Sequence, residues 1–255
     1  MKRSIFCMFV IAVLLIGAGD SEAQEIKGGV VKYEQTTKYN FESVFNPRGD
    51  ADPRLKQFLA SLPKEGKEYR VLYFTDKKAL YEEDMTVEKP APSRELMGAR
   101  ERMQYMKPPS VEIEKVYSDF GIDEVIQQVM FMTRNFRVKM APEKKAWKFT
   151  NKNVKVLDYT CMGAEMAIGD TTITAWFTSE VPVSTGPEMF SGLPGLVLAV
   201  EINGETAIIA TSIELNPPAE GVIVKPEQGE EYEKEAFDKI VKEKIEEWEK
   251  TQRRR

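Results

Sequence analysis

Three sulfur-bearing side chains lie close together in the second half of the chain. Cys161, Met162 and Met166 offer one thiolate and two thioethers, which are the soft ligands that select Cu(I). If this stretch is a strand, Cys161 and Met162 point to opposite faces, and Met166 shares a face with Met162. Because buried cysteine and methionine are also ordinary core residues, core packing is the favoured interpretation and copper handling is the alternative.

The chain contains no histidine. This excludes Ser-His and Cys-His nucleophile pairs, HExxH zinc sites and histidine general bases. A nucleophilic Cys161 then needs Lys, Arg or a helix N-terminus to lower its pKa, yet its predicted position is in the middle of a strand. No cofactor is expected.

Carboxylates remain as candidate catalysts, because a pair of them is sufficient for glycoside hydrolysis. Glu180 and Glu188 flank a stretch rich in turn residues, and Glu165 and Glu201 lie on strands that we expect to be neighbours. The chain has 41 acidic residues, so near pairs arise by chance. Surface charge is the favoured interpretation of each, and a histidine-free hydrolase is the alternative.

The stretch from Pro182 to Gly195 is the main candidate for binding, because loops on rigid sheets commonly carry binding sites. Its prolines and glycines fix the backbone shape, and two apolar side chains offer contacts. The favoured interpretation of its energetic role is structural and compatible with binding: Phe190 and Leu193 fill one end of the sheet while the glycines permit close strand approach. The candidate residues are Pro182, Gly186, Pro187, Met189, Phe190, Gly192, Leu193, Pro194 and Gly195.

Strands are required on both sides of this loop. The run 196–200 has no polar residue and predicts a strand covered on both faces, preceded by a type II turn with Pro194 at i+1 and Gly195 at i+2. Asn203-Gly204 predicts a type I′ hairpin turn, and Gly169-Asp170 predicts a second hairpin. The predicted strands are 28–45 (one strand or two), 69–74, 79–81, 125–138 (with a helix over 123–132 as an alternative), 147–149, 154–156, 162–168, 171–177, 196–202, 206–215 and an edge strand at 222–224.

Three helices are predicted. Asp52-Pro53 pairs an N-cap with proline at the first helical position, ahead of an apolar stripe that ends at Leu62. The segment 90–109 is bracketed by prolines and predicts an amphipathic helix, interpreted as a covering element, with a lid as the alternative. Residues 230–252 predict a C-terminal helix with an apolar stripe that includes Phe237 and Trp248.

These patterns predict an α+β fold, in which a mainly antiparallel, curved sheet or half-barrel carries a few covering helices. Lys2-Arg3, the apolar run 5–16 and Ser21-Glu22-Ala23 follow the order of a secretory signal peptide. We therefore expect residues 1–23 to be removed, leaving one domain over 24–255 with a helical insertion at 90–109. The processed chain has one cysteine, so no intramolecular disulfide is expected. It has no apolar run long enough to span a membrane, so no transmembrane segment is expected either.

The net charge of −5 lacks the basic excess of a nucleic-acid-binding protein, so no nucleic acid partner is expected. The leader predicts export to the periplasm or the extracellular space.

Three segments resemble a known family: Tyr159 to Ala164, Ala175 to Ser184, and Phe190 to Leu198. They are similar to the GLPGLI family of exported proteins from Gram-negative bacteria, which is named for its motif; Val197 stands here in place of the final isoleucine. The family has no established activity, so the resemblance implies a class of protein and no catalytic residues.

The resulting hypothesis is a non-enzymatic exported protein whose sheet binds a hydrophobic ligand or an envelope partner. The alternatives are the carboxylate-dependent hydrolase and the Cu(I)-handling protein.

Overall fold

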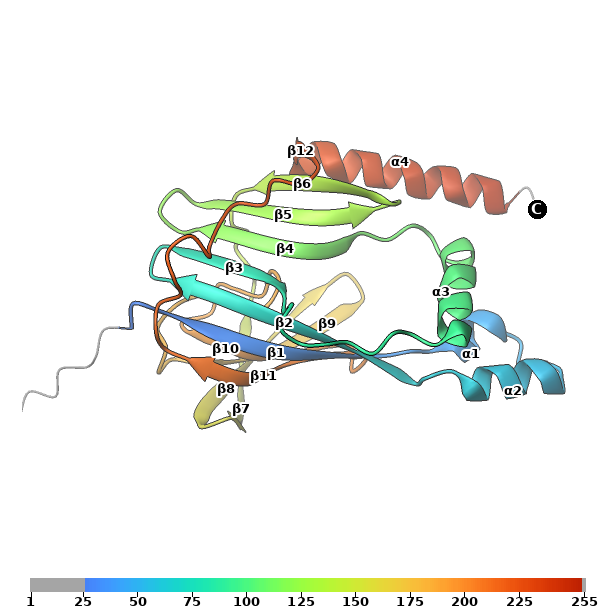
Figure 1. Ribbon diagram of the computed structural model, residues 1–255, viewed down its shortest axis with the longest axis horizontal. Helices are drawn as coiled ribbons and strands as arrows, with labels where there is room; N and C mark the ends of the chain where they lie inside the picture. Colours follow the sequence, from blue (N-terminus) through green and yellow to red (C-terminus); the bar gives the residue numbers. More distant parts are fainter. Residues whose placement is uncertain (1–25, 254–255) are drawn as a thin grey trace, which may run out of the picture.

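The computed structural model describes residues 26–253, which form an α+β structure built on one large, unclosed, curved sheet (Figure 1). This confirms the predicted fold class, while the predicted leader lies outside the described residues. The sheet order is β12-β6-β5-β4-β3-β2-β1-β11-β10-β9-β8-β7. The strands are β1 (Gly28–Lys38), β2 (Glu65–Thr75), β3 (Lys78–Glu83), β4 (Glu112–Asp119), β5 (Glu124–Phe131), β6 (Arg134–Met140), β7 (Lys148–Val156), β8 (Tyr159–Ile168), β9 (Thr171–Thr178), β10 (Leu196–Ile202), β11 (Thr206–Glu214) and β12 (Glu230–Glu233). The helices are α1 (Phe41–Phe45), α2 (Pro53–Ser61), α3 (Arg94–Met106) and α4 (Lys234–Gln252).

Two antiparallel meanders, β1–β6 and β7–β11, make up most of the sheet and are joined by the pairing of β1 with β11. Only seven residues, 141–147, connect β6 to β7, although ten strand-to-strand steps separate these strands in the sheet order. In a flat sheet those steps would span about 48 Å, whereas the extended connection reaches about 29 Å. The sheet must therefore curve, and the connection spans the resulting hollow.

The predicted hairpins form where turn residues supply the required backbone angles. Asn203 and Gly204 have φ of 52° and 67°, and the Glu205 N–H donates to the Ile202 carbonyl at 2.9 Å, which is the predicted type I′ turn between β10 and β11. Gly169, with φ of 58°, turns β8 into β9. A third hairpin, β5–β6, turns at Met132-Thr133, where both residues have positive φ.

Four predicted elements are corrected. The first strand ends at Lys38, and Phe41–Phe45 is a short helix because the Asn40 side chain accepts from the Ser43 N–H. The run 125–138 is two strands, so its helical alternative is wrong. Residues 222–224 form no strand. Residues Glu230–Glu233 precede the last helix as β12, parallel to β6.

The main core lies on the concave side of the sheet, around the fully apolar strand β10. Leu196, Val197 and Leu198 are completely buried, as the absence of polar residues predicts. The buried Tyr33 of β1 donates its hydroxyl proton to the Val197 carbonyl at 2.7 Å, while its ring meets that of Tyr81 edge-on at 6.1 Å. The core thus connects the centre of the sheet to the motif strand.

Helices α1, α2 and α3 lie at the opposite end of the sheet from the β2–β3 and β4–β5 turns, whereas α4 runs along β6 (Figure 1). Helices α1, α2 and α3 pack on one another around Phe41, Leu62 and Ala99. Asp52 caps α2 as predicted, accepting hydrogen bonds from the backbone N–H groups of Arg54 and Leu55.

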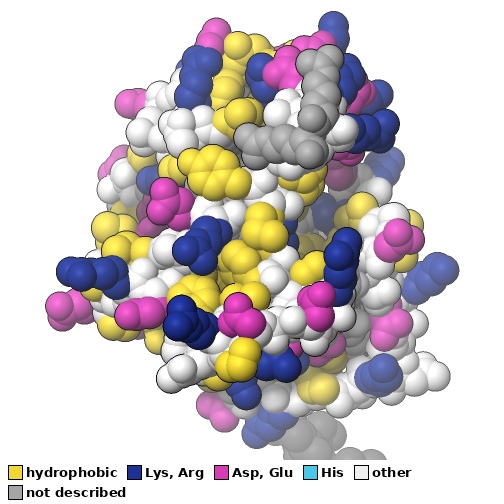
Figure 2. All heavy atoms as spheres, turned by 90° about the vertical axis from the view of Figure 1, so that its right-hand side faces the viewer, with side chains coloured by type: hydrophobic (Ala, Val, Ile, Leu, Met, Phe, Trp, Pro, Cys, Tyr) yellow, Lys and Arg dark blue, Asp and Glu magenta, His cyan; other side chains and the backbone are white. Residues whose placement is uncertain are grey.

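The end of the molecule that carries α1, α2 and α3 faces the viewer in Figure 2 and shows hydrophobic patches between charged side chains. Among residues 26–253, no helix has the length and hydropathy needed to cross a membrane.

Candidate functional site

The segment between β9 and β10, residues 179–195, folds back over the concave side through a series of very tight turns. Four backbone hydrogen bonds of the three-residue γ-turn type occur in it, each 2.8–2.9 Å long. One of them joins the Gly195 N–H to the Leu193 carbonyl, so the turn at Pro194 is tighter than the predicted type II turn. Two further bonds, from Leu196 to Val181 and from Val197 to Thr185, close the base of the loop.

Glycine is required at two positions of this loop because backbone atoms approach closely. A Cβ on Gly195, whose φ is +153°, would lie 2.1 Å from the Thr178 carbonyl oxygen. A Cβ on Gly186 would lie 2.5 Å from the Phe190 carbonyl oxygen and 2.6 Å from the Val197 Cβ. Phe190 and Leu193 are buried in the main core, so the loop is a fixed wall of the hollow.

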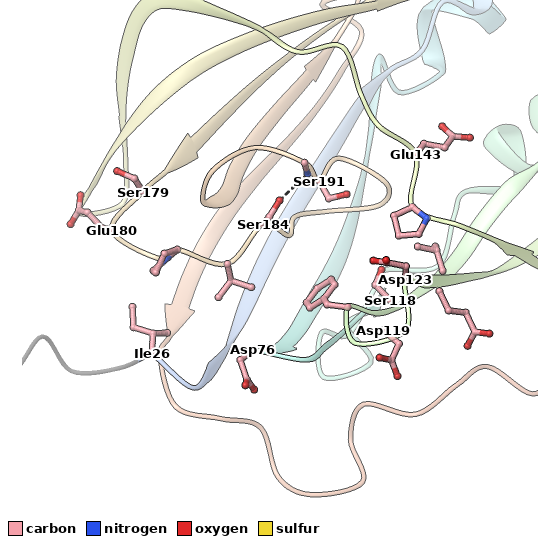
Figure 3. Close-up of a pocket in the computed structure, with 17 residues that line it drawn as sticks. Ile26, Asp76, Ser118, Asp119, Asp123, Glu143, Ser179, Glu180, Ser184 and Ser191 are labelled. Atoms are coloured by element: carbon pink, nitrogen blue, oxygen red, sulfur yellow. Dashed lines mark hydrogen bonds between the residues drawn. The ribbon is translucent and has the colours of Figure 1, made fainter.

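This wall borders an open hollow of about 840 Å³, here called the outer cleft. It lies at the end of the sheet away from α1–α3 and is formed by the β2–β3 and β4–β5 turns, the 141–147 connection and the loop. Figure 3 shows Glu180 on one side, Asp119, Asp123 and Glu143 on the other, and Ser184 and Ser191 between them. The Gly192 N–H donates to Ser184 Oγ at 3.1 Å, marked by the dashed line.

The outer cleft is strongly acidic. Its polar lining includes six carboxylates, and no lysine or arginine of the described chain lines it. Lys78 pairs with Asp119 at 3.6 Å, and Lys139 pairs with Glu124 at 3.0 Å. Lys225 also pairs with Glu124. Among residues 26–253 the other four carboxylates form no ion pair; they are Asp76, Asp123, Glu143 and Glu180.

Apolar side chains share the same lining. Ile26, Phe120, Val125, Pro142, Pro182 and Val183 contribute to the walls. The outer cleft therefore offers an apolar surface together with negative charge at its two sides.

A second, smaller hollow of about 20 Å³, here called the inner pocket, adjoins the outer cleft. The two share several lining residues, including Phe120, Glu143 and Ser191. The inner pocket is further lined by Tyr81 of β3, Lys145 of the 141–147 connection and Glu188 of the loop. Its volume exceeds the roughly 10–15 Å³ that one water molecule needs, so it has room for one small polar group.

Burial shifts the titration of the groups around the inner pocket. Desolvation raises the pKa of the Glu188 carboxyl; the positive Arg70 opposes this rise and the negative Glu68 adds to it. Desolvation also raises the pKa of Tyr81, with Glu188 as the second cause, and it lowers the pKa of Lys145. All three shifts favour the neutral form, and such groups in a hollow are candidates for function.

We expect Glu188→Gln to stabilise the protein increasingly as the pH rises. Because the folded-state pKa of Glu188 lies above its unfolded value of about 4.3, the stability due to its protonated form is complete below that pH. It is lost as the pH rises through the folded-state pKa. Urea unfolding of both proteins at pH 4 and pH 8 tests this.

The exposed Glu220→Gln is the matched control, since it removes the same charge without burial. A difference between Glu188→Gln and the parent protein that is the same at both pH values would contradict the prediction. The titratable groups around Glu188 are Arg70 and Glu68 of β2 and Tyr81 of β3, and Glu143 and Lys145 of the 141–147 connection, which line the same pocket.

The predicted loop residues divide into three groups. Pro182 and Gly192 line the outer cleft; Gly186 and Met189 line the inner pocket. The others line neither hollow: Pro187, Phe190, Leu193 and Gly195 are buried, and Pro194 is exposed.

The sulfur-bearing residues do not share one environment. Cys161 is completely buried in the main core, whereas the neighbouring Met162 is 39% exposed. Burial raises the pKa of the Cys161 thiol to about 11, which disfavours the thiolate that both nucleophilic attack and metal binding require. Met166 packs in the main core. Within residues 26–253, no group of three or more Cys, Asp or Glu is placed to hold a metal ion.

Most of the polar residues at the two hollows are absent from the set predicted from sequence. The sequence offers Glu180 and Glu188 only as a carboxylate pair, and the structure places them at different hollows. One signal does mark Glu188: it is the only charged residue between positions 181 and 200. Arg70, Tyr81 and Lys145 carry no such signal, because the fold alone brings them near the loop.

Comparisons with known proteins place the loop in a recognised segment. A family model described as "Protein of unknown function (Porph_ging)" matches residues 164–199. That range includes β9, the loop and the first part of β10. No curated protein matches the chain.

Among solved structures, the chain is similar to PNGF-II in two crystal forms, with TM-scores of 0.51 and 0.52 and 15% sequence identity. The likeness covers 84% of this chain but 33% and 32% of the PNGF-II chains. This chain therefore spans about a third of the length of PNGF-II. At this identity the likeness shows the fold alone.

Proposed function

We propose that this protein is an exported, GLPGLI-type envelope protein whose outer cleft binds a small organic cation with an apolar body. The observation that carries the proposal is the combination of four carboxylates without ion pairs and an apolar lining in one hollow. A volume of about 840 Å³ falls within the range of small-molecule sites, roughly 300–1,000 Å³. The Porph_ging match over the motif segment supports the family assignment.

Charge and shape both favour such a ligand over a purely hydrophobic one. A wholly apolar molecule in the outer cleft would remove unpaired carboxylates from water without compensation, which is costly. A cationic head group compensates that charge, while the apolar body covers the rings and aliphatic groups of the lining. The sequence alone predicts a hydrophobic ligand or an envelope partner; the acidic lining restricts the proposed ligand to an amphiphilic cation.

Titration calorimetry with hexyltrimethylammonium and with hexanesulfonate tests the proposal, because the probes share an alkyl chain and differ in the sign of their charge. We expect the cation alone to bind, with an affinity that falls as salt rises. Replacing Asp123, Glu143 and Glu180 together by Asn, Gln and Gln should weaken binding about tenfold or more, equivalent to about 1.4 kcal/mol.

A matched triple variant removes the same charge at the far end of the molecule. Glu95 and Glu101 of α3 and Glu243 of α4 are exposed and line neither hollow, so their replacement by Gln should leave binding unchanged. Equal binding of the two probes, or equal loss of binding in the two triple variants, would show that the outer cleft is not a cation site.

A hydrolase that uses carboxylates is the second candidate function. It is favoured by Glu188, whose raised pKa suits a general acid, close to the ionisable carboxylates of the outer cleft. Screening nitrophenyl glycosides with the parent protein and with Glu188→Gln tests it. Turnover that disappears in the variant supports a hydrolase, and no turnover of any glycoside by the parent protein counts against it.

A further inference from the structure

Four buried side-chain polar atoms lack a hydrogen-bond partner within the described part of the chain. Two of them belong to residues on one face of the neighbouring strands β2 and β3, and one of these residues, Tyr81, lines the inner pocket. These two are the Tyr81 hydroxyl and Arg70 Nε. Arg70 and Leu72 share one face of β2, and Leu72 pairs with Tyr81 of β3. Tyr81 is only 3% exposed, so water at the protein surface does not satisfy its hydroxyl.

An unpaired buried hydroxyl is unusual, because most buried polar groups in proteins have a partner. The Tyr81 ring is well supported, since it packs edge-on against Tyr33. Its hydroxyl, however, belongs to a residue that lines a hollow large enough for one polar group. The hollow has room for a partner from outside the chain, either a water molecule or a polar group of a ligand that displaces it.

The character of the lining restricts what that group is. Glu188 and Lys145 line the same hollow, and burial favours the neutral form of each. Glu143 also lines this hollow, but its side chain is exposed and shared with the outer cleft. A charged group brought into such a small space would lose much of its hydration, which is costly. A neutral hydroxyl can both donate and accept a hydrogen bond, which matches the Tyr81 hydroxyl and the Glu188 carboxyl.

We propose that the inner pocket is a subsite for a neutral hydroxyl on the ligand of the outer cleft, with Tyr81 and Glu188 as its hydrogen-bond partners. This inference rests on the proposed function, and it narrows the ligand class to cationic amino alcohols. The connection between the hollows, through shared lining at Phe120, Glu143 and Ser191, lets one molecule occupy both.

A series of four amines with one chain length tests the subsite by titration calorimetry: hexylamine, 6-aminohexan-1-ol, 1,6-diaminohexane and 6-aminohexanoate. We expect the amino alcohol to bind about three- to tenfold more tightly than hexylamine, which is the gain from one hydrogen-bonded hydroxyl. The amino acid should gain nothing from its second charged group. The second ammonium of the diamine can pair with the acidic sides of the outer cleft, so any gain by the diamine should be unchanged in Tyr81→Phe.

Tyr81→Phe removes the hydroxyl and keeps the ring. We expect this variant to bind hexylamine as before and to lose the preference for the amino alcohol. The Tyr81 hydroxyl has no partner in residues 26–253, so the melting temperature of the Tyr81→Phe variant should not fall below that of the parent protein. This measurement separates loss of the subsite from loss of the fold. Tyr73→Phe is the matched control, since Tyr73 follows Leu72 in β2 and points to the opposite face.

The outcomes separate the two proposals. If hexylamine and the amino alcohol bind equally, the hydroxyl subsite is wrong and the cation site stands. A preference for the amino alcohol that persists in Tyr81→Phe, or tighter binding by the amino acid than by the amino alcohol, also overturns the subsite. If neither hexylamine nor the amino alcohol binds, the cation site is wrong and the subsite inference falls with it.

Discussion

Gly195→Ala is expected to destabilise the protein by about 3 kcal/mol or more. The new Cβ would lie 2.1 Å from the Thr178 carbonyl oxygen, and the φ of +153° is strained for any L side chain. Backbone strain of this kind costs about 1–3 kcal/mol, and overpacking costs about the same again. Urea unfolding followed by circular dichroism measures the loss, which should appear as a lower midpoint.

Gly169→Ala is the matched control for this substitution. Gly169 also has positive φ, at +58°, but nothing lies within 4 Å of the position of its missing Cβ. Its replacement should cost only about 1 kcal/mol, the price of the backbone conformation. Equal losses in the two variants would mean that close approach to Thr178 does not explain the glycine in the motif.

Phe237→Ala should cost about 3–5 kcal/mol and release α4 from the sheet. The Phe237 ring is 4% exposed and lies 5.3 Å from the ring of Phe136 and 6.1 Å from that of Phe131. Deleting a buried phenylalanine leaves a cavity and removes transfer free energy, which together give this magnitude. Hydrogen exchange of α4 amides, measured beside urea unfolding, should show loss of protection along the helix.

Trp248→Ala provides the comparison within the same helix. Trp248 is only partly buried and does not belong to the cluster around Phe237. We expect a clearly smaller loss of stability and retained amide protection in the first half of α4. An equal or larger effect of Trp248→Ala would show that α4 is anchored at its C-terminal end.

Local signals predicted much of the fold because their chemistry acts within a few residues. Asn203-Gly204 supplies two positive φ angles by itself, and Asp52 caps its helix through neighbouring N–H groups. Strand β12 shows the limit. Glu230–Glu233 continues the polar pattern of the helix that follows, yet its backbone pairs with β6. The pairing with β6 therefore determines this strand, and no local sequence pattern predicts it.

The candidate site was less accessible to sequence reasoning for the same reason. The sequence predicts the motif loop as a candidate binding loop, and four of its nine candidate residues line the two hollows. The partners of Glu188, in contrast, come from strands more than one hundred residues earlier in the chain. In the sequence, Tyr81 and Arg70 are one tyrosine and one arginine among many. Only the burial of their polar atoms and the lack of hydrogen-bond partners distinguish them.

The place of β1 in the sheet has a consequence for the order of folding. Within each meander, neighbouring strands follow one another directly in the order of strands along the chain. Strand β1, however, must pair with β11, where Tyr33 meets Ala210. Bringing β1 and β11 together closes a loop that contains most of the chain, and this costs conformational entropy before the contacts between the strands form. Such non-local pairing slows folding. We expect the two meanders to form early and their junction last, which leaves the edges of β1 and β11 open to other chains until the whole polypeptide is present.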